Sequence, residues 1–506
     1  MMTRVHAADL RSLNPLPGAP GAEFLEHHGV LPVRRENGRL LVATWLESVD
    51  ERVLDDLRLF FDAEPVTAVL PEDDVRAAIR RVYGAEATTA REIIEGMVNP
   101  VPDPRIGLNT QRTGDPALDD LVSQANEAPV VRLVNLLLLE ALEARASDVH
   151  LEQYAEMLEV RYRIDGVLQP APTPPQQHMS AVISRLKIMA ELDIAERRLP
   201  QDGRIRLRLK ERDVDVRVST IPTLHGESVV LRLLDKRQGR IGLDDLGMAP
   251  DTLAAFEEVI GRPNGIVLAT GPTGSGKTTT LYAALDRIRS GREKVLTVED
   301  PVEYELPGVA QVPVNAGVGL TFARALRALL RQDPDVLLVG EIRDPETAEI
   351  ATHASLTGHL VLSTLHTNDA SSALTRLLDL RLEPYLVAST VEAVLAQRLV
   401  RTICPECAEE RPSTDEERRA LAGIGDTVGE GRGCDTCRGS GYLGRTGIYE
   451  LLQVDGSMKD EIYRRSGSAA LKRLAAAAGM RTLTEDGRRL VLEGVTTPAE
   501  VLRAAG

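Results

Sequence analysis

Nine consecutive residues, positions 271–279, constrain this chain more than any other stretch. They read GPTGSGKTT and fit the phosphate-binding pattern G-x-x-x-x-G-K-[ST]. The apolar run Gly265–Thr270 before them favours a strand, and apolar residues at helical spacing follow over positions 281–288. A glycine-rich turn between a strand and a helix N-terminus directs several backbone N–H groups at one anion, so the stretch predicts a nucleoside triphosphate site.

The residue types in this loop fit ATP and Mg²⁺ as cofactors. Lys277 is placed to reach the β- and γ-phosphates, and the Thr278 hydroxyl is a ligand for Mg²⁺. A chance glycine-rich turn is the alternative, and the flanking strand and helix patterns argue against it. The predicted nucleotide-binding residues are Gly271, Pro272, Thr273, Gly274, Ser275, Gly276, Lys277, Thr278 and Thr279.

Composition limits the other functions that the chain can have. The formal net charge is −16 and aromatic residues make up 3%, which argues against a binder of nucleic acid or of an anionic membrane. No apolar run reaches the roughly 18–20 residues that a membrane span needs, and the N-terminus lacks a signal-peptide pattern. We therefore expect a cytoplasmic protein that reaches a membrane only through partners.

The chain is long enough for several domains. Asn37-Gly38 between two apolar stretches predicts a hairpin, and amphipathic helices are expected over Glu51–Phe61 and Pro71–Tyr83. Prolines and glycines interrupt the periodic spacing of apolar residues over residues 84–118, as is typical of a tether. The predicted segments are an N-terminal docking domain at 1–85, a linker at 86–118, a second domain at 119–237, an ATPase domain at 242–401, a zinc-binding subdomain at 402–445 and a helical region at 446–506.

The second domain combines helices with strands. We expect a helix over Pro129–Arg145, a hairpin turn at Asp165-Gly166 and a second helix near Ser180–Leu192. Alternation in the strand that follows places three arginines on one face, Arg204, Arg206 and Arg208. This face is either a solvated basic surface or a set of arginines that reach the phosphates of a neighbouring subunit, and the residue pattern leaves both open.

Two further β-runs lead to carboxylates, and ligands of open α/β sheets bind beyond the carboxyl ends of strands. One run delivers Glu299 and Asp300, placed to hold Mg²⁺ or to polarise the attacking water, although a cap and turn is the alternative. The other ends in Gly340, where an Asp would usually ligate the metal, and Glu341. We expect Glu341 to orient or deprotonate water, with Glu299 or Asp300 supplying the missing carboxylate.

A last β-run lies between two histidines. His359 precedes it, and His366 follows it beside Thr367 and Asn368. A lone histidine is more often a core residue, but this pair is predicted to act at the site, with His366 as a γ-phosphate sensor. The order of strand, phosphate loop, helix and three further strands that lead to Glu299, Glu341 and His366 predicts a RecA-like ATPase core that works by positioning and charge neutralisation.

All four cysteines fall in two C-x-x-C pairs, Cys404 with Cys407 and Cys434 with Cys437. Four thiolates fill a tetrahedral Zn²⁺ shell, so the pattern predicts a structural zinc site. The acidic segment between the pairs favours a knuckle that docks protein over one that binds nucleic acid. Beyond Gly447 the chain is expected to form short amphipathic helices.

With these motifs in place, the chain resembles the secretion ATPase superfamily, specifically the type II secretion system ATPases (GspE-like). It is close to the type IV pilus extension ATPases. The most specific stretches include Leu192–Arg204, Val214–Thr220, Thr297–Tyr304, Arg331–Asp344 and Thr357–Asn368. The resemblance implies a multidomain α/β fold: a RecA-like P-loop core, a preceding α+β (PAS-like) domain, an N-terminal α+β docking domain and a tetracysteine zinc knuckle.

The resemblance also implies a function and partners. Family members are homohexamers that hydrolyse ATP to power pseudopilus assembly and protein export, and Arg204 and Arg217 match the arginines that complete the ATP site. The implied partners are a membrane-anchored GspL-like protein and a GspF-like inner-membrane platform protein, which would make this chain peripheral to the inner membrane. A pilus extension ATPase shares every motif and is the main alternative. A nucleic-acid translocase and an ATP-binding scaffold without turnover are two others.

Overall fold

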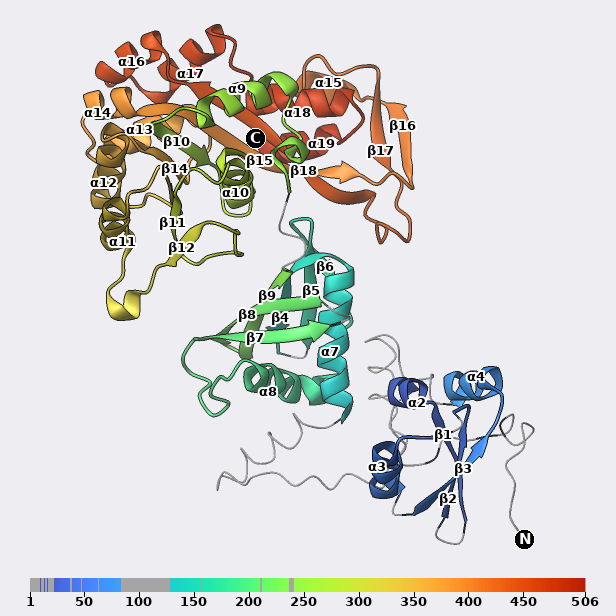
Figure 1. Ribbon diagram of the computed structural model, residues 1–506. Coiled ribbons are helices and arrows are strands. Elements are labelled where there is room, and N and C mark those ends of the chain that lie inside the picture. Colours follow the sequence, from blue (N-terminus) through green and yellow to red (C-terminus); the bar gives the residue numbers. More distant parts are fainter. Residues whose placement is uncertain are drawn as a thin grey trace. The chain divides into compact units, whose positions relative to one another are not determined.

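The structure is a computed structural model of the chain (Figure 1). It describes residues 22–82, 128–235 and 241–505, with gaps at 37–38, 47, 62, 156 and 210–211, together with Leu10, Leu13 and Leu16. The predicted linker at 86–118 and the predicted turn at Asn37-Gly38 therefore lie outside the described residues. The chain divides into two compact units, and the second contains everything from residue 189 onward.

The N-terminal elements form a three-stranded sheet in the order β1-β2-β3 with helices. Strand β2 pairs antiparallel with β1 and parallel with β3. The predicted helices and the two hairpin strands are confirmed, whereas β3 was not predicted. The elements are α2 (Ala22–His28), β1 (Val30–Glu36), β2 (Arg39–Thr44), α3 (Glu51–Phe61), β3 (Glu64–Val69) and α4 (Glu72–Val82).

A six-stranded sheet in the order β6-β5-β4-β9-β8-β7 forms the middle of the chain. Asp165 and Gly166 have φ angles of 49° and 85°, so the predicted primed turn between β5 and β6 is confirmed. Both predicted helices are also present. The elements are α7 (Ala128–Glu143), β4 (Ala146–Gln153), β5 (Leu158–Ile164), β6 (Val167–Pro170), η1 (Gln176–His178), α8 (Met179–Met189), β7 (Gln201–Leu209), β8 (Arg212–Thr223) and β9 (Gly226–Asp235).

The last part of the chain is built on a seven-stranded sheet in the order β12-β11-β13-β14-β10-β15-β18. Its paired strands run parallel, except that β18 is antiparallel to β15. The predicted strands before the phosphate loop, Glu299, Glu341 and His366 are all confirmed. The strands are β10 (Gly265–Thr270), β11 (Val295–Glu299), β12 (Ala310–Pro313), β13 (Val336–Val339), β14 (Leu360–Leu365), β15 (Val391–Ile403) and β18 (Tyr442–Gln453).

One prediction about this part is wrong. Helices were expected to begin after Gly447, but β18 continues to Gln453 before the first of them. Ile448 and Leu452 are fully buried there, because β18 packs along β15 as the last strand of the sheet. The apolar residues that suggested an amphipathic helix are thus the buried residues of a strand.

Alternate side chains of β10 belong to two separate hydrophobic cores, one on each face of the sheet. Val267 and Ala269 pack with α9 and α10, while Ile266 and Leu268 belong to the core that includes residues of six helices. Burial on both faces explains the continuous apolar runs of the sequence and leaves the carboxyl ends of the strands for ligands. The helices are α9 (Pro250–Ile260) and α10 (Lys277–Ile288) on one face, and α11 (Phe322–Leu329), α12 (Pro345–Leu356), α13 (Ala370–Asp379), α14 (Pro384–Thr390), α16 (Gly456–Tyr463) and α17 (Ser468–Ala477) on the other.

The remaining elements surround the cysteines and the C-terminus. Strands β16 (Ala408–Pro412) and β17 (Thr427–Gly431) form an antiparallel hairpin between β15 and β18. The helices α15 (Asp415–Ala420), α18 (Leu483–Leu492) and α19 (Pro498–Ala505) complete this region. Within the described ranges, no helix has the length and apolar character that crossing a membrane requires.

Candidate nucleotide site and metal centre

The phosphate loop joins β10 to α10 in a conformation that glycine permits. Gly274 and Gly276 have φ angles of 79° and 89°, in the left-handed region. Gly276 directly precedes α10, whose first N–H groups have no partner within the helix. The Ser275 hydroxyl is buried, and nothing in the described part of the chain forms a hydrogen bond with it. Available N–H groups and an unpaired buried hydroxyl fit a bound phosphate.

The Lys277 side chain is folded into this loop. Its Nζ donates to the carbonyl oxygens of Gly271 at 2.8 Å and Pro272 at 3.0 Å. Burial lowers the pKa of Lys277 to about 8; the charge of Glu341 opposes this shift and that of Arg398 adds to it. A polyphosphate would supply the negative charge that this buried lysine needs. The predicted Mg²⁺ ligand Thr278 is the second residue of α10 and is half-buried.

Glu341 lies just beyond β13 and is almost buried. One of its carboxylate oxygens is 2.6 Å from Nη2 of Arg343, and the other is 3.4 Å from Nε2 of His366. His366 follows β14, which pairs with both β13 and β10. The structure therefore brings two predicted catalytic residues together, one strand away from the phosphate loop. Sequence reasoning missed Arg343, although its position two residues after Glu341 was a usable signal.

Close packing accounts for the glycine at position 340. A Cβ atom there would lie 3.2 Å from the Val298 carbonyl oxygen and 3.3 Å from Cα of Glu299. Any side chain would thus require β11 to shift, which is consistent with the expectation that a metal-binding carboxylate comes from another residue.

Glu299 and Asp300 have different surroundings. Glu299 is buried, and one of its oxygens accepts hydrogen bonds from Thr297 Oγ1 at 2.5 Å and from Gln311 Nε2 at 3.2 Å. Its other oxygen accepts a hydrogen bond from Tyr282, whose pKa is raised by burial and by this contact. Asp300 is exposed, and no residue that the structure describes bonds to its carboxylate. Asp300 is therefore the freer of the two predicted carboxylates.

The two predicted histidines lie at opposite ends of β14. His359 precedes the strand, and its Nδ1 lies 2.8 Å from the carbonyl oxygen of Ala354 at the end of α12. The strand between it and His366 spans roughly 20 Å at about 3.3 Å per residue. The structure therefore places His366, but not His359, beside Glu341 within one chain.

Arginines form a row across the six-stranded sheet. Arg204 is paired with Arg217, and Arg217 with Arg232, in the register of β7, β8 and β9. Arg232 in turn pairs with Asp148 and donates to it at 3.0 Å. Like charges in directly opposite positions are unfavourable unless an anion neutralises them. Here Arg217 Nη2 lies 3.3 Å from the Glu303 carboxylate and donates to the Val302 carbonyl oxygen at 3.4 Å, so a phosphate-binding role for this pair stays a prediction. By contrast, the predicted face residue Arg206 is opposite Asp215, and the side chain of Arg208 lies outside the described residues.

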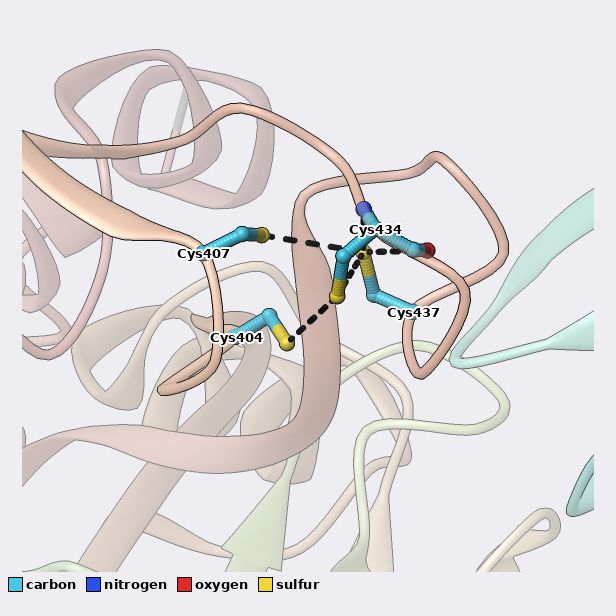
Figure 2. Close-up of side chains that lie close together, drawn as sticks. All are labelled: Cys404, Cys407, Cys434 and Cys437. Atoms are coloured by element: carbon cyan, nitrogen blue, oxygen red, sulfur yellow. Dashed lines mark hydrogen bonds between the residues drawn. The ribbon is translucent and has the colours of Figure 1, made fainter.

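Figure 2 shows the four cysteine side chains turned toward one another. The sulfur–sulfur distance is 3.8 Å for Cys404 and Cys434, 3.8 Å for Cys407 and Cys437, and 3.7 Å for Cys434 and Cys437. A tetrahedral Zn²⁺ with Zn–S bonds of about 2.3 Å requires sulfurs about 3.8 Å apart. The predicted cluster therefore forms, with the dimensions of a structural zinc site.

Backbone N–H groups favour the thiolate form of one member of this cluster, Cys437. Those of Cys434 and Gly441 donate to Cys437 Sγ at 3.1 Å and 3.3 Å, and that of Gly433 donates to Cys407 Sγ at 3.3 Å. Burial raises the pKa of Cys404 and that of Cys407, the latter to about 12. For Cys437 the N–H groups of Cys434 and Gly441, together with the thiols of Cys434 and Cys407, outweigh burial and lower the pKa to about 6. The thiolate is the form that binds zinc.

Comparison with known protein families shows to which family this chain belongs. A family model described as "Type II/IV secretion system protein" matches residues 123–503, and the MshEN domain model matches residues 13–89. The chain belongs to the type II/IV secretion system protein family. This confirms the family that the motifs resembled, and the chain is a secretion ATPase with the predicted multidomain α/β fold.

Relatives of this secretion ATPase cover most of its length. It is 50% identical to the type II secretion system protein E of Pseudomonas aeruginosa over 438 residues, which are 86% of each chain. It is 46% identical to the type II secretion system ATPase E of Vibrio cholerae over 437 residues, again 86% of each. The type IV pilus assembly ATPase PilB of Myxococcus xanthus is 44% identical over 487 residues, 95% of this chain and 85% of that one.

Solved structures share the fold. The ATPase DotB of Legionella pneumophila aligns with a TM-score of 0.55 at 21% identity, covering 73% of this chain and 94% of that chain. The pilus retraction motor PilT with bound ADP aligns with a TM-score of 0.50 at 26% identity, covering 72% of this chain and 95% of that one.

Proposed function

We propose that this secretion ATPase hydrolyses ATP to power pseudopilus assembly and protein export by a type II secretion system. The observation that carries the proposal is the 3.4 Å contact between Glu341 and His366 beside the loop that buries Lys277. An acid–base group, a sensor and a phosphate-binding lysine at neighbouring strand ends are the parts that phosphoryl transfer to water requires.

Each residue has a role in this proposal. Lys277 neutralises charge on the β- and γ-phosphates, and Glu341 orients the attacking water and accepts its proton. The water oxygen bonds to the γ-phosphorus as the bond to the bridging oxygen breaks, and His366 contacts the γ-phosphate. Thr278 and Asp300 would hold Mg²⁺, which neutralises phosphate charge. The buried, hydrogen-bonded Glu299 would fix the backbone position of the adjacent Asp300.

The row of arginines supports sites shared between subunits. Arg204 and Arg217 would reach the ATP of a neighbouring chain in a homohexamer, which makes them catalytic in trans. An arginine supplied in this way is worth on the order of 10³–10⁵ in kcat in phosphoryl-transfer enzymes. His359 lies too far from Glu341 of its own chain, so any catalytic role for it would also be played across a subunit boundary.

The other parts of the chain serve docking and structure. The N-terminal domain, residues 1–85, would bind the cytoplasmic domain of a membrane-anchored GspL-like protein, and hydrolysis would act on a GspF-like inner-membrane platform. These contacts would keep a cytoplasmic protein at the inner membrane, with no nucleic acid involved. Zn²⁺ on the four cysteines would stabilise the subdomain at residues 402–445, next to the ATPase domain at 242–401.

The main alternative is a type IV pilus assembly ATPase, and the 44% identity to PilB supports it. The type II secretion relatives reach higher identities, up to 53% over 388 residues, which is why we place that function first. Binding to the cytoplasmic domains of the two candidate machines would separate the alternatives.

The experiment that tests the function is the ATPase rate of the full chain against protein concentration, with and without the cytoplasmic domain of the membrane-anchored partner. We expect specific activity that rises with concentration and rises further with the partner, and loss of activity in Lys277→Ala. An absence of turnover under every condition would leave an ATP-binding scaffold. Flat, partner-independent turnover would refute the shared site.

A further inference from the structure

Arg398 lies where two loops of the nucleotide site meet. It belongs to β15, which pairs with β10, and its side chain is half-buried. Its Nη2 donates to the carbonyl oxygen of Asn368 at 2.9 Å, and its Nη1 donates to that of Gln397 at 3.2 Å. A Cβ at Gly271 would lie 3.2 Å from the same Nη1. One guanidinium therefore bonds to Asn368, two residues after His366, and lies beside Gly271 at the start of the phosphate loop.

The charge of Arg398 is not paired. Its hydrogen bonds all go to neutral oxygen atoms, and across the ranges that the structure describes no carboxylate forms an ion pair with it. Burial lowers the pKa of Arg398, while the more distant charges of Asp369 and Glu450 oppose that shift. A half-buried guanidinium that no carboxylate pairs with contributes little stability through its charge, and this favours a role at the nucleotide site.

The segment that Arg398 holds contains the proposed sensor. Residues 366–369 run from the end of β14 to the start of α13, and Thr367 is fixed to β10 through the hydroxyl of Thr270 at 2.7 Å. Arg398 supplies the next attachment, from the strand on the other side of β10. Without it, the segment after His366 would lose its connection to β15.

We propose that Arg398 is a positioning residue for hydrolysis, which ties residues 366–369 to β15 beside the phosphate loop and so holds His366 against Glu341. This inference rests on the proposed ATPase function and deepens it. Because the guanidinium lies beside Gly271, ATP bound in the phosphate loop would be coupled to the placement of the sensor.

The test compares three variants of the full chain: Arg398→Gln, Arg398→Lys and the exposed control Arg292→Gln. Steady-state ATPase rates give kcat and KM, and equilibrium binding of a fluorescent ATP analogue gives Kd. We expect Arg398→Gln to lower kcat about tenfold or more, since small displacements of a catalytic group cost up to about 100-fold, while Kd stays within about twofold. Arg398→Lys should recover part of the rate, because an ammonium reaches only one of the two carbonyl groups. Arg292→Gln should behave as wild type.

A double-variant cycle separates positioning from a merely structural role. If Arg398 acts through His366, then Arg398→Gln combined with His366→Gln is no slower than the slower single variant. Losses that multiply would overturn the inference. A rise in Kd with unchanged kcat would overturn it too, since Arg398 would then be a direct phosphate ligand.

Hydrogen exchange of residues 366–369 provides a readout that needs no turnover. Arg398→Gln should increase exchange there while the melting temperature stays within a few degrees of wild type. Unchanged exchange refutes the tether even if the chain hydrolyses no ATP. If Arg398→Gln increases exchange but the wild-type chain hydrolyses no ATP, the proposed function is refuted while the tether by Arg398 is supported.

Discussion

The carboxylate of Glu341 lies 3.4 Å from Nε2 of His366, although the two residues follow different strands. The parallel register of β13 and β14, with Val339 opposite Ser363, carries both residues to the same edge of the sheet. The Glu341 side chain is 11% exposed and that of His366 is 49% exposed. The shielded carboxylate is thus suited to proton transfer, and the open imidazole to contact with the γ-phosphate.

Replacing Glu341 by Gln should separate binding from hydrolysis. The amide keeps the shape of the side chain and leaves Lys277 in place, so ATP binding should persist. Without a proton acceptor, turnover should fall by about 10²-fold or more, the usual contribution of a general base. Phosphate release and analogue binding measure the two effects, with the exposed Glu416→Gln as control. Near-wild-type turnover would remove Glu341 from the role of base.

The ATP affinity of the free protein should decrease as the pH rises past about 8. The pKa of Lys277 is lowered to about 8 without nucleotide, mainly by burial, and bound polyphosphate favours the charged form and raises this pKa. The ATP affinity therefore has its full value below pH 8. Above pH 8 it falls by up to about tenfold per pH unit, because Lys277 of the free protein loses its proton.

Titrating a fluorescent ATP analogue at several pH values checks this dependence. Lys277→Arg is the matched control, since its side chain stays protonated throughout and its weaker binding should vary little with pH. A wild-type profile as flat as that of the control would contradict the prediction.

The two histidines at the ends of β14 should differ in effect. His366→Gln removes the contact with Glu341 and should lower kcat by about tenfold to 100-fold, in the range of a positioned polar group. His359→Gln breaks the bond to the Ala354 carbonyl and should mainly reduce stability, by about 1 kcal/mol. Steady-state kinetics and thermal unfolding of both variants test the contrast, and equal losses of kcat would show that His359 acts from a neighbouring subunit.

Mixing two inactive variants tests whether sites are shared. If Arg217 acts in trans, Arg217→Gln and Glu341→Gln chains form hybrid oligomers in which some interfaces combine an intact arginine with an intact Glu341. The mixture should then recover measurable ATPase activity that neither variant shows alone. No gain at any mixing ratio, with hybrid oligomers present, would place Arg217 in the site of its own chain.

Sequence reasoning worked best where a motif sits on a buried parallel strand. The runs before Gly271, Glu299, Glu341 and His366 are apolar on both faces, so their ends were visible without a structure. It failed at β18, because the apolar residues after Gly447 resemble an amphipathic helix until this strand is paired with β15. Arg398 was missed for the same reason, since its role depends on a strand neighbour that the sequence does not reveal.

The burial of Glu299 could not be predicted from the sequence either. Its donors Tyr282 and Gln311 come from α10 and β12, which converge on β11 only in the folded sheet. Likewise, the pairing of Arg204 with Arg217 rather than with an acidic residue depends on the register of β7 and β8. Residue spacing alone cannot supply that register, which places the two arginines opposite each other on one face.

Removing zinc should affect the cysteine subdomain and spare the nucleotide site. The four sulfurs lie within 4.8 Å of one another, and the phosphate loop takes no residue from this cluster. We expect one Zn²⁺ per chain by metal analysis, and its loss in Cys434→Ser or with a strong chelator. The β16–β17 hairpin should then become susceptible to protease, because a structural zinc contributes directly to folding.

ATP-analogue affinity should remain within about threefold of wild type, and the exposed Ser457→Ala should serve as a control that keeps its metal. Loss of nucleotide binding together with the metal would show that the knuckle supports the ATPase core, and an intact, protease-resistant hairpin without metal would refute a structural zinc site.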